Sequence, residues 1–103
     1  MNNETNPQEL TAAVVEAEGD LVSPKLAALR SKFRELVDAG TVHLTLDLAS
    51  THMVDSAGIG LLMSAHNTLK KAGGELTVIH ASKDIIELFR TMRIHKHLSV
   101  SGD

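Results

Sequence analysis

The sequence contains no cysteine, few aromatic side chains and no long apolar run. The absence of cysteine excludes disulfide bonds, thiolate metal sites and cysteine nucleophiles, and it fits a reducing compartment. Tryptophan and tyrosine are also absent, and Phe33 and Phe89 are the only phenylalanines, so the chain has no set of rings on which nucleic-acid bases could stack. No apolar stretch approaches the roughly 18 residues that a membrane span requires.

The charge pattern and the first residues further narrow the class of protein to which this chain can belong. The formal net charge is −3 and the lysines and arginines are scattered, which gives no electrostatic reason to expect a nucleic-acid partner. The opening stretch "MNNETNPQEL" has neither the basic nor the apolar region of a signal peptide. We therefore expect a cytoplasmic protein with no direct membrane insertion, in which residues 1–10 form a flexible lead, residues 11–100 one domain and residues 101–103 a tail.

The hydrophobic period changes repeatedly between two and about 3.6, which predicts strands alternating with helices. Ser23 before Pro24 predicts a helix start at which the serine oxygen caps free backbone N–H groups. Gly40 predicts the end of that helix, and Ser82 the cap of a later helix. Strands are expected at residues 11–19, 41–50, 75–80 and within 94–100, and helices at residues 24–39, 57–72 and after 82.

The stretch "TVHLTLDLAS" alternates apolar and polar residues without interruption. One face carries only apolar side chains, and the other carries polar ones: Val42, Leu44, Leu46 and Leu48 against His43, Thr45 and Asp47. This pattern is typical of a strand in a sheet with one buried face and one wetter face. A sheet covered by helices on both faces would need a strand that is apolar throughout.

The stretch "HMVDSAGIGLLMSA" places Asp55 and Ser56 where a strand is followed by a helix. A nucleophilic serine of the G-x-S-x-G type is excluded because Val54 occupies the first glycine position. A dinucleotide fingerprint is excluded because Met63 stands where the third glycine should be. His95 and His97 would point the same way in an extended segment, but no third metal ligand follows at a recognisable spacing. We therefore expect no catalytic residue, no metal site and no cofactor.

Two interpretations remain for the start of this helix. Asp55 or Ser56 can cap it, because either side-chain oxygen can accept from the first free backbone N–H groups. Gly58 and Gly60 each cost about 1 kcal/mol relative to alanine within a helix. Either close packing of the helix start or the approach of a partner surface would compensate for that cost.

The residues from "LTLDLASTHMVDSAGIGLLMSAHNTLKK" to "AGGELTVIHASKDIIELFRTMRI" resemble the STAS domain family, and within it the small bacterial anti-sigma factor antagonists. The most specific part is a strand ending in Asp47, then "VDSAGIGLL", then Gly73-Gly74 and the strand and helix that follow. The resemblance implies an α/β fold with a mixed β-sheet and helices packed mainly on one face. Many antagonists have a further helix after the last strand, whereas this chain ends at Asp103 with "HLSVSGD".

The resemblance also implies a function. In the antagonists the serine after the motif aspartate, here Ser56, is phosphorylated by an anti-sigma factor that is a serine kinase with a histidine-kinase-like ATPase fold, and a serine phosphatase reverses the modification. ATP and Mg²⁺ belong to that kinase, so this chain is expected not to be an enzyme. The residues implied in partner binding are Asp55, Ser56, Ala57, Gly58, Ile59 and Gly60. Ala57 replaces a second hydroxyl residue that is common in the family.

Two other roles stay open within the family. Some STAS proteins are regulatory scaffolds that do not act on a sigma factor, and one short relative is an accessory subunit of bacterial lipid-transport ATPases. The Asp-Ser pair and the Gly-x-Gly of this chain resemble the phosphorylated switch more closely.

Overall fold

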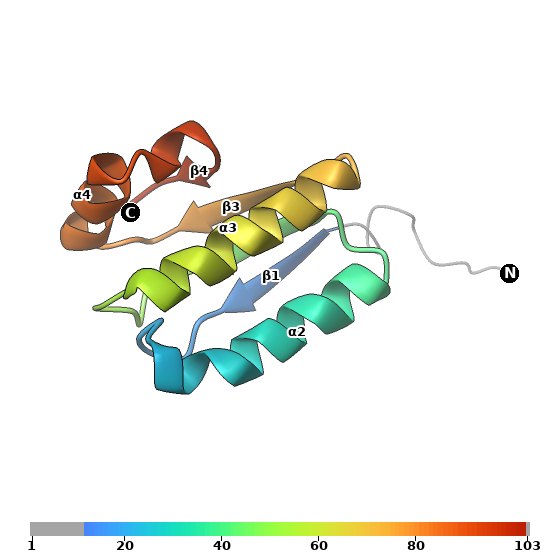
Figure 1. Cartoon of the computed structure of the whole chain (residues 1–103), viewed down its shortest axis with the longest axis horizontal. Helices are drawn as coiled ribbons and strands as arrows, with labels where there is room; N and C mark the ends of the chain where they lie inside the picture. The colour runs from blue at the N-terminus through green and yellow to red at the C-terminus, as the bar shows by residue number, and fades with distance from the viewer. Residues whose placement is uncertain (1–11, 103) are drawn as a thin grey trace, which may run out of the picture.

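The computed structural model describes residues 12–102, and the predicted N-terminal lead lies outside this range. These residues form one sheet with α-helices and two short 3₁₀ turns (Figure 1). No helix among them is both long enough and apolar enough to cross a membrane. In chain order the elements are β1 (Ala12–Glu16), η1 (Ser23–Lys25), α2 (Leu26–Asp38), β2 (His43–Asp47), α3 (Ser56–Lys71), β3 (Glu75–Ile79), α4 (Lys83–Thr91), η2 (Ile94–Lys96) and β4 (Ser99–Val100).

The four strands lie in the order β1-β2-β3-β4 and every described pair is parallel. The predicted α/β class is confirmed, and α2 and α3 lie on the same face of the sheet (Figure 1). The family resemblance implied a mixed sheet, whereas all strand pairs within residues 12–102 are parallel. A helix connects each strand to the next, and a crossover of this kind returns the chain in the same direction.

The core lies between the sheet and its helices. The inward residues of β2 and β3 are almost completely buried, whereas His43 and Glu75 on the opposite face are exposed. This confirms the one-sided burial that the alternation predicts. From the helices, Leu62 and Phe89 have no exposed surface and fill the space against the strands. The buried strand residues are Leu44, Leu46, Leu76 and Val78.

Helix caps agree with the sequence at α4 and differ at α2. The Ser82 hydroxyl accepts from the backbone N–H of Ile85 at 3.2 Å, as predicted. The prediction that Ser23 caps the first helix is wrong, because a 3₁₀ turn begins there and Lys25 precedes α2 without a side-chain cap. The backbone N–H of Ser23 instead bonds to a distant carboxylate, Asp55.

The C-terminal histidines are not on an extended strand. Residues Ile94–Lys96 form a 3₁₀ turn, and the terminal strand covers only Ser99–Val100. The ring of His97 instead lies near that of His66, with 6.3 Å between ring centroids. Among the side chains that the structure describes, no group of three or more histidine, aspartate or glutamate residues is arranged to hold a metal ion.

Gly74 lets the chain that follows α3 pass close to Val42, the residue before β2. A side chain at this position would overlap the carbonyl oxygen of Val42, to which Glu75 donates a backbone hydrogen bond of 2.8 Å. We expect Gly74→Ala to lower the free energy of unfolding by about 1–3 kcal/mol, because β3 must shift to admit the methyl group. Urea denaturation measures the change.

Glu75→Ala is the matched control, since Glu75 is the next residue, is exposed, and its backbone N–H is unchanged by the substitution. It should change stability by less than about 0.5 kcal/mol. Equal effects of the two substitutions would show that the close approach to Val42 is not a constraint.

Candidate functional site

The candidate site lies at the carboxyl end of the parallel strands, where α3 begins. Ser56 is the first residue of α3 and is exposed. The loop from β2 to α3 meets the loop from β1 to η1 at this end of the molecule (Figure 1). Parallel strands bring their carboxyl ends to one edge of a sheet, which is where sites form in open α/β folds.

Backbone hydrogen bonds join the two loops. Leu21 donates to the carbonyl of Met53 at 2.9 Å, and Asp55 donates to the carbonyl of Leu21 at 3.1 Å. These bonds flank a parallel bridge between Leu21 and Val54. The loop before Ser56 is therefore held like a short strand and is not a free surface loop.

Two side chains strengthen the same junction. The hydroxyl of Thr51, which is only 2% exposed, donates to the carbonyl of Gly19 at 2.7 Å. The Asp20 carboxylate accepts from the backbone N–H groups of His52 at 2.8 Å and Met53 at 3.1 Å. The N–H of His52 is the main reason why the pKa of Asp20 lies below its usual value of 3.8.

Asp55 is the N-cap of α3 and also holds the neighbouring loop. One carboxylate oxygen accepts from the backbone N–H of Gly58 at 2.9 Å, and the other accepts from that of Ser23 at 2.9 Å. These two bonds, that of Ser23 first, hold the pKa of Asp55 below 3.8. The capping role left open between Asp55 and Ser56 therefore belongs to Asp55.

The six sequence-predicted residues divide into accessible and buried ones. Ser56, Ala57 and Gly60 are exposed, and Asp55 is half-buried, whereas Gly58 and Ile59 are buried. A side chain at Gly58 would overlap the carbonyl oxygen of Leu21 and lie 3.0 Å from Cγ1 of Val54. Internal packing thus explains Gly58, and Ser56, Ala57 and Gly60 are the accessible members of the set.

At Gly60 a side chain would meet no atom within 4 Å. Its lack of a side chain therefore has no internal explanation comparable with that of Gly58. Gly60 lies on the exposed surface of the first turns of α3, the same end of the helix as Ser56.

Sequence reasoning missed two residues of this site. Met53 is 59% exposed in the loop before Ser56, and its place within the stretch "HMVDSAGIGLLMSA" is a signal that was available. Asp20 gives no such local signal, because its hydrogen-bond partners are 32 and 33 residues away in the chain.

A second carboxylate contact lies at the ends of β2 and β3. Nδ1 of His80 lies 3.0 Å from a carboxylate oxygen of Asp47. The backbone N–H of Ala49, and then His80, lower the pKa of Asp47. His80 contacts Asp47, and among the described residues no hydrogen bond offers its ring as a base to the hydroxyl of Ser56. A nucleophilic serine would need such a base within hydrogen-bond reach.

The lowered carboxylate pKa values predict acid sensitivity. A carboxyl group whose pKa is lowered by folding adds stability above its unfolded pKa and loses it as the pH falls through the folded pKa. We expect the stability of the protein to fall as the pH drops below the ordinary value of 3.8. In Asp20→Asn the slope should be shallower, because the amide does not titrate. Urea midpoints measured across the acid range give both slopes, and identical slopes would contradict the role of Asp20.

The two glycines of α3 should respond in opposite directions to alanine. Gly58→Ala should lower the free energy of unfolding by about 1–3 kcal/mol, because its methyl group meets Leu21. Gly60→Ala should raise it by up to about 1 kcal/mol, because its methyl group meets nothing and alanine favours the helix. Thermal and urea unfolding measure both, and a stabilising Gly58→Ala would refute the packing explanation.

Comparison with known proteins gives both a family and a fold. The family described as "Mlab, STAS domain" matches residues 5–100. The structure of the anti-sigma factor antagonist SpoIIAA in its unphosphorylated form is similar with a TM-score of 0.75 and 16% identity, over 90% of this chain and 82% of that one. The Bacillus cell fate determinant SpoIIAA in the phosphorylated form is similar with a TM-score of 0.69 and 15% identity, over 89% and 84%. On the extent of the family match, the chain belongs to the STAS domain family.

Proposed function

We propose that this protein is an anti-sigma factor antagonist that binds a serine-kinase anti-sigma factor when unphosphorylated and is released by phosphorylation at Ser56. The observation that supports this most is the exposed Ser56 hydroxyl at the first position of α3, beside a capping aspartate. The chain acts as a substrate and binding partner in this scheme, and it is not an enzyme. A serine phosphatase returns it to the binding form.

The fold can accept a phosphate at Ser56. The side chain lies at a helix N-terminus, where unpaired N–H groups and the helix dipole favour an anion. Asp55 takes its hydrogen bonds from the N–H groups of Gly58 and Ser23, so the cap forms without the Ser56 hydroxyl. We therefore expect the phosphorylated chain to stay folded.

The same phosphate would disrupt binding. It adds about −1.5 to −2 charges at neutral pH, next to the carboxylate of Asp55. A partner that packs closely on Ser56, Ala57 and Gly60 would meet both the charge and the added bulk. Met53, which is 59% exposed, extends this surface with an apolar side chain that can anchor the unphosphorylated contact.

The comparisons support the proposal at the level of the fold. SpoIIAA, whose structures in both phosphorylation states have this fold, is described as an anti-sigma factor antagonist. The partner inferred for this chain is a kinase with a histidine-kinase-like ATPase fold that supplies ATP and Mg²⁺. The protein then works in the cytoplasm, without nucleic acid, membrane insertion or a cofactor of its own.

A second candidate is an accessory subunit of a bacterial lipid-transport ATPase. The observation that favours it is the matching family, which is described as "Mlab, STAS domain" and not as an antagonist. In that role the exposed start of α3 would bind an ATPase subunit constitutively, and Ser56 would need no phosphorylation.

The test uses Ser56→Ala, Ser56→Asp and the wild type with the kinase-type anti-sigma factor of the same organism and Mg·ATP. Intact mass should show one phosphate on the wild type and none on Ser56→Ala, which should bind the kinase constitutively. Ser56→Asp should weaken binding, although its single charge is smaller than that of a phosphate. Because Asp55 supplies the cap, Ser56→Ala should change stability by less than about 0.5 kcal/mol.

Ser50→Ala serves as the matched control, since Ser50 is an exposed hydroxyl in the same loop. It should be phosphorylated like the wild type. A phosphate that persists in Ser56→Ala would place the acceptor elsewhere. A chain that takes up no phosphate and instead binds a lipid-transport ATPase would support the second candidate.

A further inference from the structure

Strand β1 lies at an edge of the sheet within residues 12–102, with β2 as its neighbour. The backbone N–H of Ala17 donates to the carbonyl of Asp47 in line with β2, so Val15 and Ala17 turn their backbone groups toward β2. Alternate residues of a strand face opposite sides, so Val14 and Glu16 turn their N–H and C=O groups outward. An edge of this kind can pair with another strand unless it is protected.

The side chain of Val14 makes this edge unusual. It is 67% exposed and belongs to the face of the sheet opposite the core, as does Glu16. A charged residue such as Glu16 is typical of a protected edge, whereas an exposed β-branched residue favours strand pairing.

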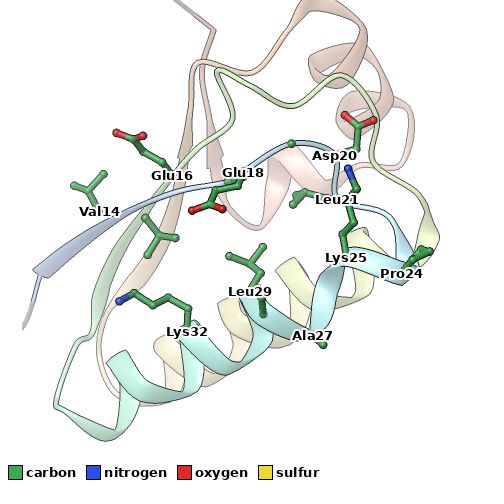
Figure 2. A pocket seen from close by; sticks show the side chains of 14 residues that line it. Val14, Glu16, Glu18, Asp20, Leu21, Pro24, Lys25, Ala27, Leu29 and Lys32 are labelled. Atoms are coloured by element: carbon green, nitrogen blue, oxygen red, sulfur yellow. The ribbon is translucent and has the colours of Figure 1, made fainter.

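A groove runs along the same edge, between β1 and α2. In Figure 1, α2 lies to the outer side of β1, and the space between them is a cavity of about 940 Å³. Leu29 projects from α2 toward the strand, and Lys32 lies one turn further along (Figure 2). The buried side chain of Val15 also lines the groove, which gives it an apolar floor.

Charges border this floor on both sides. Glu16 and Glu18 lie on the side of the strand, Lys32 lies on α2, and Lys25 ends the short 3₁₀ turn η1 before it (Figure 2). Glu16 points to the face of the sheet opposite the core. In a strand added beside β1, the side chains on that same face would lie next to Glu16. Basic residues on that face would complement the carboxylate, and their aliphatic stems would cover Val14.

The geometry favours a single strand over a second copy of this chain. Neighbouring strands lie about 4.8 Å apart, whereas packed helices need about 8–10 Å between axes. Because α2 already overhangs the outer side of β1, two copies paired through β1 would bring both α2 helices over the same two strands (Figure 1). An extended segment without its own covering helix avoids this clash.

We propose that the groove between β1 and α2 binds an extended segment of a partner protein, which adds to β1 as a strand with apolar side chains facing Leu29 and basic side chains facing Glu16. This mode takes its affinity from main-chain hydrogen bonds and its specificity from alternate side chains. It goes beyond the proposed switch, because it needs neither Ser56 nor a phosphate.

The test uses the full chain labelled for NMR and a synthetic peptide of about eight residues that alternates valine and lysine. The peptide should slow hydrogen exchange at the amides of Val14 and Glu16. A matched peptide that alternates valine and glutamate should bind at least about threefold more weakly, because like charges on neighbouring strands repel. In Glu16→Lys this preference should reverse.

Two substitutions at one position test the backbone pairing directly. Val14→Pro removes an outward N–H without removing one that faces β2, so it should abolish binding of the valine-lysine peptide. Val14→Thr keeps the N–H and should bind within about twofold of the wild type, as both residues favour strands. If Val14→Pro does not fold, the preference reversal in Glu16→Lys decides alone.

Several results would overturn the proposal. Equal binding to Val14→Pro and Val14→Thr would rule out strand addition, and an unchanged peptide preference in Glu16→Lys would rule out the charge pattern. Protection of the Val14 and Glu16 amides in the free monomer would show that residues 1–11 of the chain cover the edge. A dimer in sedimentation that loses this protection on dilution would assign the edge to a second copy.

Discussion

The close approach of Leu21 to the start of α3 is the constraint on which the candidate site depends. The carbonyl of Leu21 accepts the backbone N–H of Asp55 and lies where a side chain of residue 58 would have to be. Glycine at position 58 therefore allows the β1–η1 loop to touch the helix start. Because the two loops are joined, the position of Ser56 depends on residues that precede it by more than 30 places.

Backbone N–H groups, more than cations, compensate the negative charge at this end of the sheet. Asp20, Asp47 and Asp55 each accept at least one backbone N–H, and each has a lowered pKa for that reason. A phosphate at Ser56 would join these carboxylates at a helix N-terminus. The helix N-terminus favours an anion there, whereas the surface offered to a proposed partner would become more negative. Under the proposed function, this contrast would let a modification change binding without changing the fold.

The exposed surface around Ser56 and the groove beside β1 share one loop. Asp20 lines the groove beside β1 and also holds the His52–Met53 segment that leads to Ser56. A partner strand in the groove would lie close to the loop that positions Ser56. The shared loop is a physical link through which occupation of one surface can influence the other.

Local sequence patterns were sufficient to predict much of the fold. Alternation in residues 41–50 predicted a strand with one buried face, and the Ser82 cap was confirmed at α4. Such features depend on spacing of two to four residues, so they are visible in the sequence. The Ser23 cap was wrong for the same reason: the local pattern was suitable, but the chain there follows a 3₁₀ turn held by Asp55.

The sequence by itself therefore determined the order and type of the elements, the one-sided core and the candidate segment from Asp55 to Gly60. Only the tertiary structure decided that Asp55 caps α3, that Gly58 is buried while Gly60 is open, and that Asp20 reaches His52. The physical reason is the distance along the chain. Periodicity records which side of an element is buried, whereas contacts between residues 32 positions apart exist only once parallel strands have brought their carboxyl ends together.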